Sequence, residues 1–296
     1  RSASALQYFR EAVERAPDFA EAWAALALQH IARGNSGPAS DRGAHYAQAR
    51  SAAFAALERN PRLGEAHTAL GTLAFYFDWD WEAADRSFRQ ALEYAPGDAF
   101  AYQRYSMFLA ALGRLDEAID AARLSQAIEP MVPTRSSSLG TTYYYARRYE
   151  EAAAEMQRAL DLSPRFATAE YGLGRIRASQ GRFDEAITHL TRAAELGSPV
   201  SAFLELARVH ALHGDVERSA AAIEKLGALQ PLPDITPDNL AFVDAAHGEL
   251  DTAFARLAAA LTLRAGNLLW IRVDPRFDPL RNDPRFESLV RRLQFP

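Results

Sequence analysis

Proline recurs along this chain at a fixed distance. Pro96, Pro130 and Pro164 are each 34 residues apart. Eight times along the chain a small residue, usually Ala, is followed seven residues later by another. A period of this length is typical of helical repeat arrays, in which each unit is two antiparallel helices that cannot bury their apolar faces alone. The spacing therefore predicts an all-α solenoid with one continuous core, a fold that favours binding over catalysis.

The clearest unit runs from Ala99 to Pro130. Apolar and small residues recur at helical spacing on two segments that are separated by Gly113, a residue suited to ending the first helix. We expect Ser106, Ala118 and Ser125 to lie where the two helices cross, because closely approaching backbones leave no room for larger side chains. The residues that set this spacing are Tyr102, Tyr105, Ser106, Leu109, Leu115, Ala118, Ile119 and Ala122.

This unit resembles the tetratricopeptide repeat (TPR) family, whose first helix carries an aromatic residue, Leu-Gly and Tyr, and whose second carries Ala, Phe, Ala and Pro. The resemblance implies a right-handed superhelical solenoid of about eight helix pairs. The chain then begins in mid-repeat, as part of something longer, because the second helix of the first unit has no first helix before it. Matching residues in other units are Ala5, Phe9, Ala12, Pro17, Leu70, Gly71, Ala84, Phe88, Ala91, Leu139, Gly140, Tyr143, Ala152, Ala159, Leu173, Gly174, Phe183, Ala186, Leu206, Ala207, Gly214, Ser219, Leu240, Ala241, Gly248, Ala253 and Ala260.

Two units depart from the pattern. The second has about ten extra residues, which we place in a long loop from Gly34 to Asp41. The third has one extra residue near the turn at residues 78–81. We expect the array to cover residues 1–266 and a helical cap to cover residues 267–296.

Composition excludes several classes of protein. The chain has no Cys, so disulfides and thiol chemistry are absent, and its net charge is −5 without a basic cluster. We therefore expect no direct contact between this segment and nucleic acid. No apolar run reaches the roughly 18 residues that a membrane-spanning helix needs.

Three motifs resemble metal or cofactor sites, and none has the full set of residues that such a site needs. His210 and His213 are too loosely placed on a helix to form a metal site without a second converging pair. Asp78 and Asp80 begin like a calcium loop, but Ala83 stands where that loop needs Gly. Gly172 and Gly174 lie within a helix and lack the third Gly of a dinucleotide fingerprint, so helix crossing explains them better. We predict no enzymatic activity, no catalytic residue, no metal and no cofactor.

The TPR resemblance implies a concave groove lined by the first helix of each unit. The family's inward-facing positions carry aromatic, hydroxyl and Arg side chains in this chain, and Tyr and Arg often dominate binding energy at interfaces. The predicted groove residues are Thr72, Tyr76, Gln103, Arg104, Met107, Thr141, Tyr144, Tyr145, Tyr171 and Arg175.

Several of these Tyr could instead pack between adjacent first helices. Residues 143–145 are three successive Tyr, which point in widely separated directions around a helix, so we expect at least one to face outward or into the groove. Lys and Asn, through which one TPR mode binds a chaperone carboxylate, are missing from the predicted groove. Arg104 and Arg175 could still hold an acidic peptide or a carboxylate ligand.

The tail contains Asp-Pro-Arg-Phe twice, at residues 274–277 and 283–286. Asp followed by Pro is a helix start, because the carboxylate caps free amides and Pro fits the first turn. We expect the tail to cover the last repeat with Phe277, Leu280, Phe286, Leu289 and Leu293.

The tail, the long second-unit loop and the turn at residues 77–82 together resemble the C-terminal TPR region of bacterial multidomain regulators. In those proteins the array follows a winged-helix, adenylate-cyclase or protein-kinase domain, often with a TolB-like segment between. The resemblance implies a cytoplasmic signalling protein whose TPR region recruits a protein or peptide partner, or forms a homo-oligomer. The alternative is a sensor that binds a small effector and controls a missing N-terminal domain.

Overall fold

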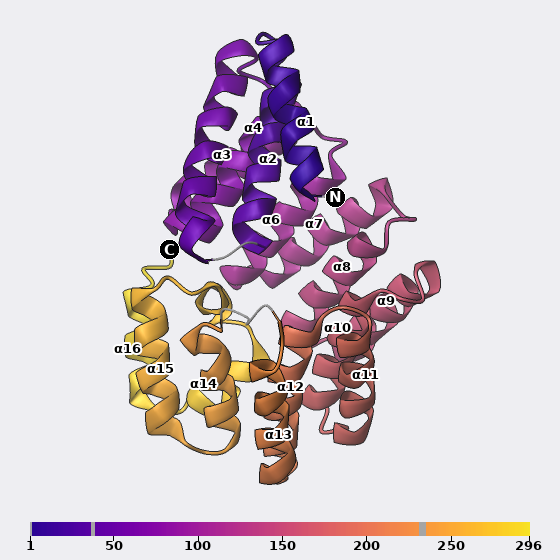
Figure 1. Cartoon of the computed structure of the whole chain (residues 1–296), viewed down its shortest axis with the longest axis vertical. Helices are drawn as coiled ribbons and strands as arrows, with labels where there is room; N and C mark the ends of the chain where they lie inside the picture. Colours follow the sequence, from indigo (N-terminus) through magenta and orange to yellow (C-terminus); the bar gives the residue numbers. More distant parts are fainter. Residues whose placement is uncertain (1, 37–38, 231–234) are drawn as a thin grey trace. The chain divides into compact units, whose positions relative to one another are not determined.

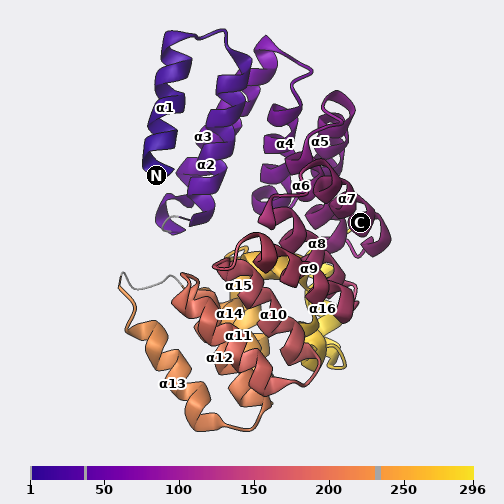
Figure 2. The same cartoon turned by 90° about the vertical axis from the view of Figure 1, so that its right-hand side faces the viewer.

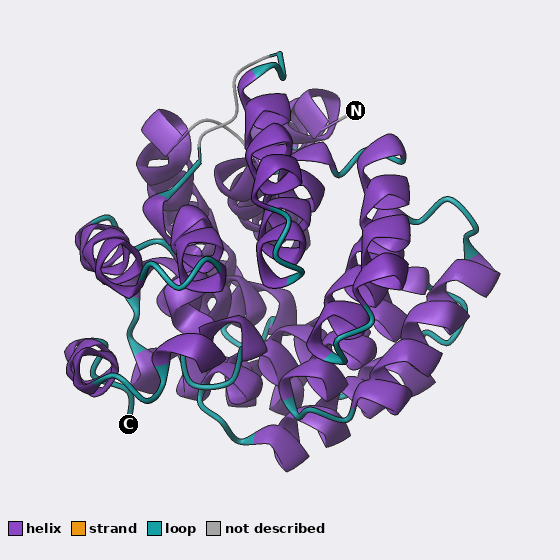
Figure 3. Cartoon of the chain, turned by 90° about the horizontal axis from the view of Figure 1, so that it is seen from below, coloured by secondary structure: helices purple, strands orange, loops and turns teal. Residues whose placement is uncertain are grey.

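The computed structural model describes residues 2–36, 39–230 and 235–296, and within this part of the chain it contains helices and loops but no strand (Figure 3). The chain divides into two compact units, residues 1–108 and 109–296. The predicted all-α fold is confirmed. Among the described residues, no helix is both long enough and apolar enough to cross a membrane.

The first unit is built from successive helix pairs that follow an unpaired first helix, as the sequence predicts (Figure 2). Helix α1 packs on α2, α2 packs on α3, and α4 packs on α5. The helices are α1 (Ser2–Arg15), α2 (Ala20–Ser36), α3 (Ala39–Arg59), α4 (Gly64–Leu73), the π-helical turn η1 (Ala74–Asp78), α5 (Trp81–Tyr94) and α6 (Ala99–Ala111), which crosses the boundary between the units.

In the first unit, the two regions that depart from the repeat pattern are largely helical. The predicted loop from Gly34 to Asp41 is wrong at its two ends, because α2 extends to Ser36 and α3 begins at Ala39; residues 37–38 lie outside the described chain. The extra residue of the third unit forms the π-helical turn η1, and Trp79 adopts a left-handed conformation with φ of 57°. A π-helical turn accommodates one added residue without ending the helix.

The second unit continues the pairing (Figure 1). Helices α8 and α9, α10 and α11, α12 and α13, and α14 and α15 pack against one another in pairs. Its elements are α7 (Leu115–Ile128), α8 (Pro133–Tyr145), α9 (Tyr149–Leu162), α10 (Ala167–Ser179), α11 (Phe183–Glu195), α12 (Pro199–Leu212), α13 (Val216–Gly227), α14 (Pro237–Ala246), α15 (Leu250–Thr262), the 3₁₀ turns η2 (Gly266–Trp270) and η3 (Pro275–Leu280), and α16 (Pro284–Arg292).

Small residues set the close approach of paired helices. A Cβ atom on Gly174 of α10 would lie 2.5 Å from Leu190 Cγ of α11, and one on Gly172 would lie 2.6 Å from the Met156 side chain of α9. A Cβ on Gly174 would force the two helices apart, whereas at Gly172 the flexible end of Met156 can move aside. The geometry therefore supports the helix-crossing interpretation at Gly174.

The tail belongs to the core of the second unit. Asp274 and Asp283 each accept a hydrogen bond from the main-chain amide two residues later, and so cap η3 and α16 as the sequence predicts. All five apolar side chains that were expected to dock, at positions 277, 280, 286, 289 and 293, are buried. The tail also reaches α8 and α10, well beyond the last repeat that it was expected to cover.

Candidate binding site

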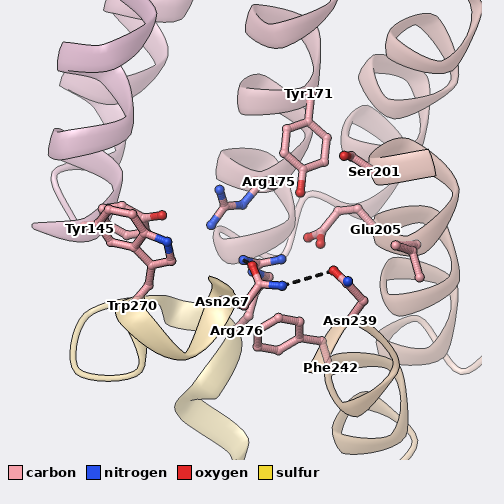
Figure 4. Close-up of a pocket in the computed structure, with 11 residues that line it drawn as sticks. Tyr145, Tyr171, Arg175, Ser201, Glu205, Asn239, Phe242, Asn267, Trp270 and Arg276 are labelled. Atoms are coloured by element: carbon pink, nitrogen blue, oxygen red, sulfur yellow. Dashed lines mark hydrogen bonds between the residues drawn. The ribbon is translucent and has the colours of Figure 1, made fainter. Parts of the chain in front are cut away.

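The first helices of four successive pairs, α8, α10, α12 and α14, present one face that we call the inner face of the second unit. Helix α10 neighbours both α8 and α12, and α12 neighbours α14. Residues four apart on a helix share a face. Tyr171 and Arg175 on α10, and Ser201 and Glu205 on α12, therefore point to the same side of the unit, where Figure 4 shows them around one pocket.

The tail lies across this inner face as an irregular segment. The indole of Trp270 stacks on the ring of Tyr145, with centroids 5.1 Å apart and planes 13° from parallel. The guanidinium of Arg276 lies 4.1 Å from the ring centroid of Phe242. Further along, Asp278 accepts two hydrogen bonds of 2.6 Å from Arg147, which lies in the turn after α8.

A buried charge cluster fixes the centre of this contact. The carboxylate of Asp274 is fully buried and accepts hydrogen bonds from Arg175 Nη2 at 3.0 Å and Arg276 Nη2 at 2.7 Å. Asn267 Oδ1 also accepts from Arg276, at 3.2 Å, and Asn267 Nδ2 donates to Asn239 at 3.0 Å (Figure 4). Buried charges persist only where partners compensate them, so these bonds specify one position for the tail.

Between the tail and the inner face remains a pocket of about 210 Å³. Aromatic and charged side chains alternate around it. On its α12 side, burial alone would raise the pKa of Glu205, but the charge and hydrogen bonds of Arg208 outweigh burial and hold that pKa below its usual range. Its lining residues are Tyr145, Tyr171, Arg175, Ser201, Leu204, Glu205, Asn239, Phe242, Asn267, Trp270 and Arg276.

The predicted groove residues of the second unit divide between core and pocket. Tyr145, Tyr171 and Arg175 line the pocket, whereas the Thr141 hydroxyl donates to the Ser137 carbonyl at 2.9 Å. Tyr144 is only 2% exposed, because the Arg175 guanidinium covers its ring at 4.3 Å. Burial raises the pKa of Tyr144 to about 12.

Of the three successive Tyr, of which we expect at least one to face outward or into the groove, Tyr145 lines the pocket on the inner face. Tyr143, Tyr144 and Tyr145 are all buried. Arg123 donates hydrogen bonds to the Tyr143 hydroxyl at 2.9 and 3.1 Å, Arg175 covers Tyr144, and Trp270 of the tail covers Tyr145. Side chains from elsewhere in the unit fill the directions that the helix leaves open.

The predicted groove residues of the first unit are less buried than those of the second, with one exception. Thr72 is buried and its hydroxyl donates to the Thr68 carbonyl at 2.7 Å, so it is part of the core. Tyr76, Gln103, Arg104 and Met107 are half-buried. The Arg104 guanidinium lies 4.7 Å from the ring centroid of Phe100.

Sequence reasoning missed the pocket residues on α12, α14 and the tail. One signal could have found two of them, because Tyr171, Glu205 and Asn239 are each 34 residues apart and so occupy the same position in successive units. The tail residues carried no such signal. Among the described residues, no group of three or more metal-ligating side chains comes together, around His210 and His213 or elsewhere.

Comparisons with known proteins agree with this architecture. Two overlapping segments, residues 138–200 and 179–232, match the family described as tetratricopeptide repeat. No curated protein sequence matches the chain.

Several solved structures have a similar fold. PilW, a type IV pilus biogenesis factor, is 21% identical with a TM-score of 0.59, over 73% of this chain and 95% of its own. A tetratricopeptide repeat protein from Parabacteroides merdae is 16% identical with a TM-score of 0.59, over 90% of this chain and 98% of its own. The hetero-tetramer Cut9–Hcn1 gives 17% identity and a TM-score of 0.59, over 99% of this chain and 46% of the other. Residues 138–232 therefore match the tetratricopeptide repeat family, and the similar solved structures share the fold of the chain as a whole.

Proposed function

We propose that this chain is a non-catalytic scaffold for protein–protein interaction, which binds a peptide or partner segment on the first helices of its repeats. The observation that carries the proposal is the tail itself. An irregular polypeptide segment lies on the inner face of the second unit, held by a stacked Trp270, a buried Asp274 and a cation–π contact of Arg276. Such a surface has the aromatic and Arg composition of a polypeptide-binding face.

In the first unit we propose that the corresponding face receives the partner. Tyr76, Gln103, Arg104 and Met107 are half-buried there. Similar folds support this use of the repeats, since one is found in the hetero-tetramer Cut9–Hcn1 and another in the pilus biogenesis factor PilW. We further propose that the chain is the TPR region of a larger bacterial regulatory protein; its cytoplasmic location, its avoidance of nucleic acid and its homo-oligomerisation stay predictions.

Arg104→Ala should weaken partner binding by about 1–3 kcal/mol, or roughly 5- to 150-fold, because few side chains carry most of an interface's energy. The test is capture of partners from an extract of the native cell by the purified chain, quantified by mass spectrometry. Arg86→Ala on the exposed side of α5 is the matched control and should leave capture unchanged. Capture that survives Arg104→Ala and is lost with Arg86→Ala would contradict this assignment of the binding face.

The pocket of the second unit supports a second candidate function, the sensing of a small effector. It is lined by the buried Arg175, whose Nε has no hydrogen-bond partner among the described residues, and a purely structural contact between tail and repeats does not require such an unpaired donor.

A further inference from the structure

Arg175 is a buried cation with unused hydrogen-bonding capacity. The residue is 8% exposed, and within the described chain its side chain donates one hydrogen bond, from Nη2 to Asp274. Its Nε has no hydrogen-bond partner among the residues that the structure describes. A guanidinium has more N–H groups than any other side chain, and each buried N–H without a partner costs about 1–3 kcal/mol. Arg175 lines the pocket, so an oxygen atom of a ligand there would meet donors that the protein leaves unpaired.

The other charges at this end of the pocket are already matched. Arg276 donates from its main-chain amide, Nε and Nη2 to Asp274, and from Nη2 to Asn267. Asp274 is fully buried between the two Arg side chains, so it cannot receive a cationic ligand. Arg175 is therefore the charged group at this end that still has unpaired hydrogen-bond donors. These donors suit an anion such as a carboxylate.

The opposite wall of the pocket carries a hydrogen-bond acceptor that a ligand's donor could meet. Both hydrogen bonds from Arg208 reach Glu205 Oε1, whereas Glu205 Oε2 accepts none within the described chain. In Figure 4 the Glu205 carboxylate faces the pocket below the Tyr171 hydroxyl, across from Arg175, with Ser201 at the rim. A negatively charged wall disfavours phosphates and dicarboxylates and favours a ligand that carries an N–H or O–H group.

The rest of the lining is mixed. Leu204, Phe242, Trp270 and Tyr145 contribute apolar surface, next to the side-chain amides of Asn239 and Asn267. The volume of about 210 Å³ lies below the range of roughly 300–1,000 Å³ that is typical of pockets for drug-sized ligands. The ligand is therefore small and has an apolar part.

We propose that this pocket binds a small carboxylate that also bears a hydrogen-bond donor, the chemistry shared by apolar α-amino acids and α-hydroxy acids. The ligand carboxylate accepts from Arg175, its amino or hydroxyl group donates to Glu205 Oε2, and its side chain lies against Trp270 and Phe242. This inference rests on the second function proposed above and is independent of partner binding by the first unit.

The experiment is isothermal titration of the full chain with four compounds that share one isobutyl group. Leucine and leucic acid carry both groups, isocaproic acid lacks the donor, and isoamylamine lacks the carboxylate. We expect leucine, leucic acid or both to bind, and the two compounds with a single group to bind at least roughly tenfold more weakly, since each loses a charge-assisted hydrogen bond. The other standard L-amino acids and their hydroxy acids are screened by thermal shift, because a ligand of the native state raises the unfolding midpoint.

Three variants test whether binding takes place in the pocket. Ser201 is exposed at the pocket rim, so Ser201→Trp should fill the mouth and abolish binding without lowering the unfolding midpoint. Ser51→Trp, at an exposed position of α3, should bind normally. Glu205→Gln distinguishes amino acids from hydroxy acids. It should weaken the binding of an amino acid more than that of a hydroxy acid, because an ammonium group depends more than a hydroxyl on the negative charge that the substitution removes.

Binding that Ser201→Trp leaves intact would overturn the proposal, as would the absence of any midpoint shift with every amino acid and hydroxy acid at millimolar concentration. Capture of a protein partner through Arg104 does not depend on either result, so failure of this inference and failure of the scaffold function are distinguishable.

Discussion

A chain that ends at Ala265 should lose at least about 4 kcal/mol of unfolding free energy in its second unit, as much as a single buried Phe→Ala substitution costs. The truncation removes more than one such side chain and uncovers the inner face that they contact. It also leaves the buried Arg175 without its carboxylate partner. The large buried apolar side chains that are lost are Leu268, Leu269, Trp270, Ile271, Val273, Phe277, Leu280, Phe286, Leu289 and Leu293.

Urea unfolding followed by circular dichroism measures this loss. Deletion of Pro296 alone is the control, and we expect it to change little because this residue is exposed. An unchanged unfolding midpoint in the longer truncation would show that the tail is not part of the folded core.

Asp274→Ala should cost about 3–5 kcal/mol, because it leaves two buried guanidinium groups without their shared carboxylate. Burial by itself raises the pKa of Asp274, but the charges of Arg276 and Arg175 outweigh burial and hold the pKa well below its usual range. A lowered native pKa means that the carboxylate stabilises the fold above its unfolded pKa of about 3.9, and that this contribution is lost as the pH falls further.

The difference in unfolding free energy between the natural chain and Asp274→Ala should therefore be full at neutral pH and shrink in acid. Urea titrations at several pH values measure it. Asp283→Ala is the matched control, because Asp283 occupies the same place in the second Asp-Pro-Arg-Phe, where its partner Arg285 is exposed. A smaller loss is expected there, limited to the cap of α16. Equal effects of the two substitutions would contradict the special role of Asp274.

The repeat spacing predicted the helices because their limits are set locally. Pro133, Pro199 and Pro237 each stand at the first position of a first helix, where the missing amide costs nothing. Gly181 ends α10 with φ of 73°, a conformation that other residues rarely adopt. The segment around Gly34 and the turn at Trp79 escaped prediction because an insertion can extend a helix or widen one turn of it as easily as it forms a loop.

Some residues of the candidate site could be predicted from the sequence, and others could not. Tyr145, Tyr171 and Arg175 follow from the family's register, and the same register continued by 34 residues reaches Glu205 and Asn239. The partners from the tail could not be found in this way. Arg175 and Asp274 are 99 residues apart, and their contact depends on the path of a non-repeating segment across four helices.

The central claim is that the inner face of the repeats holds a polypeptide segment, here the chain's own tail, through the contact of Arg175 with Asp274. A double-mutant cycle on the full chain, with Arg175→Gln, Asp274→Asn and the double variant, measures the coupling free energy of that contact by urea unfolding. We expect a coupling of at least about 1.5 kcal/mol, as for close charge pairs in other interfaces. A coupling below about 0.3 kcal/mol, the level of independent sites, would contradict the account.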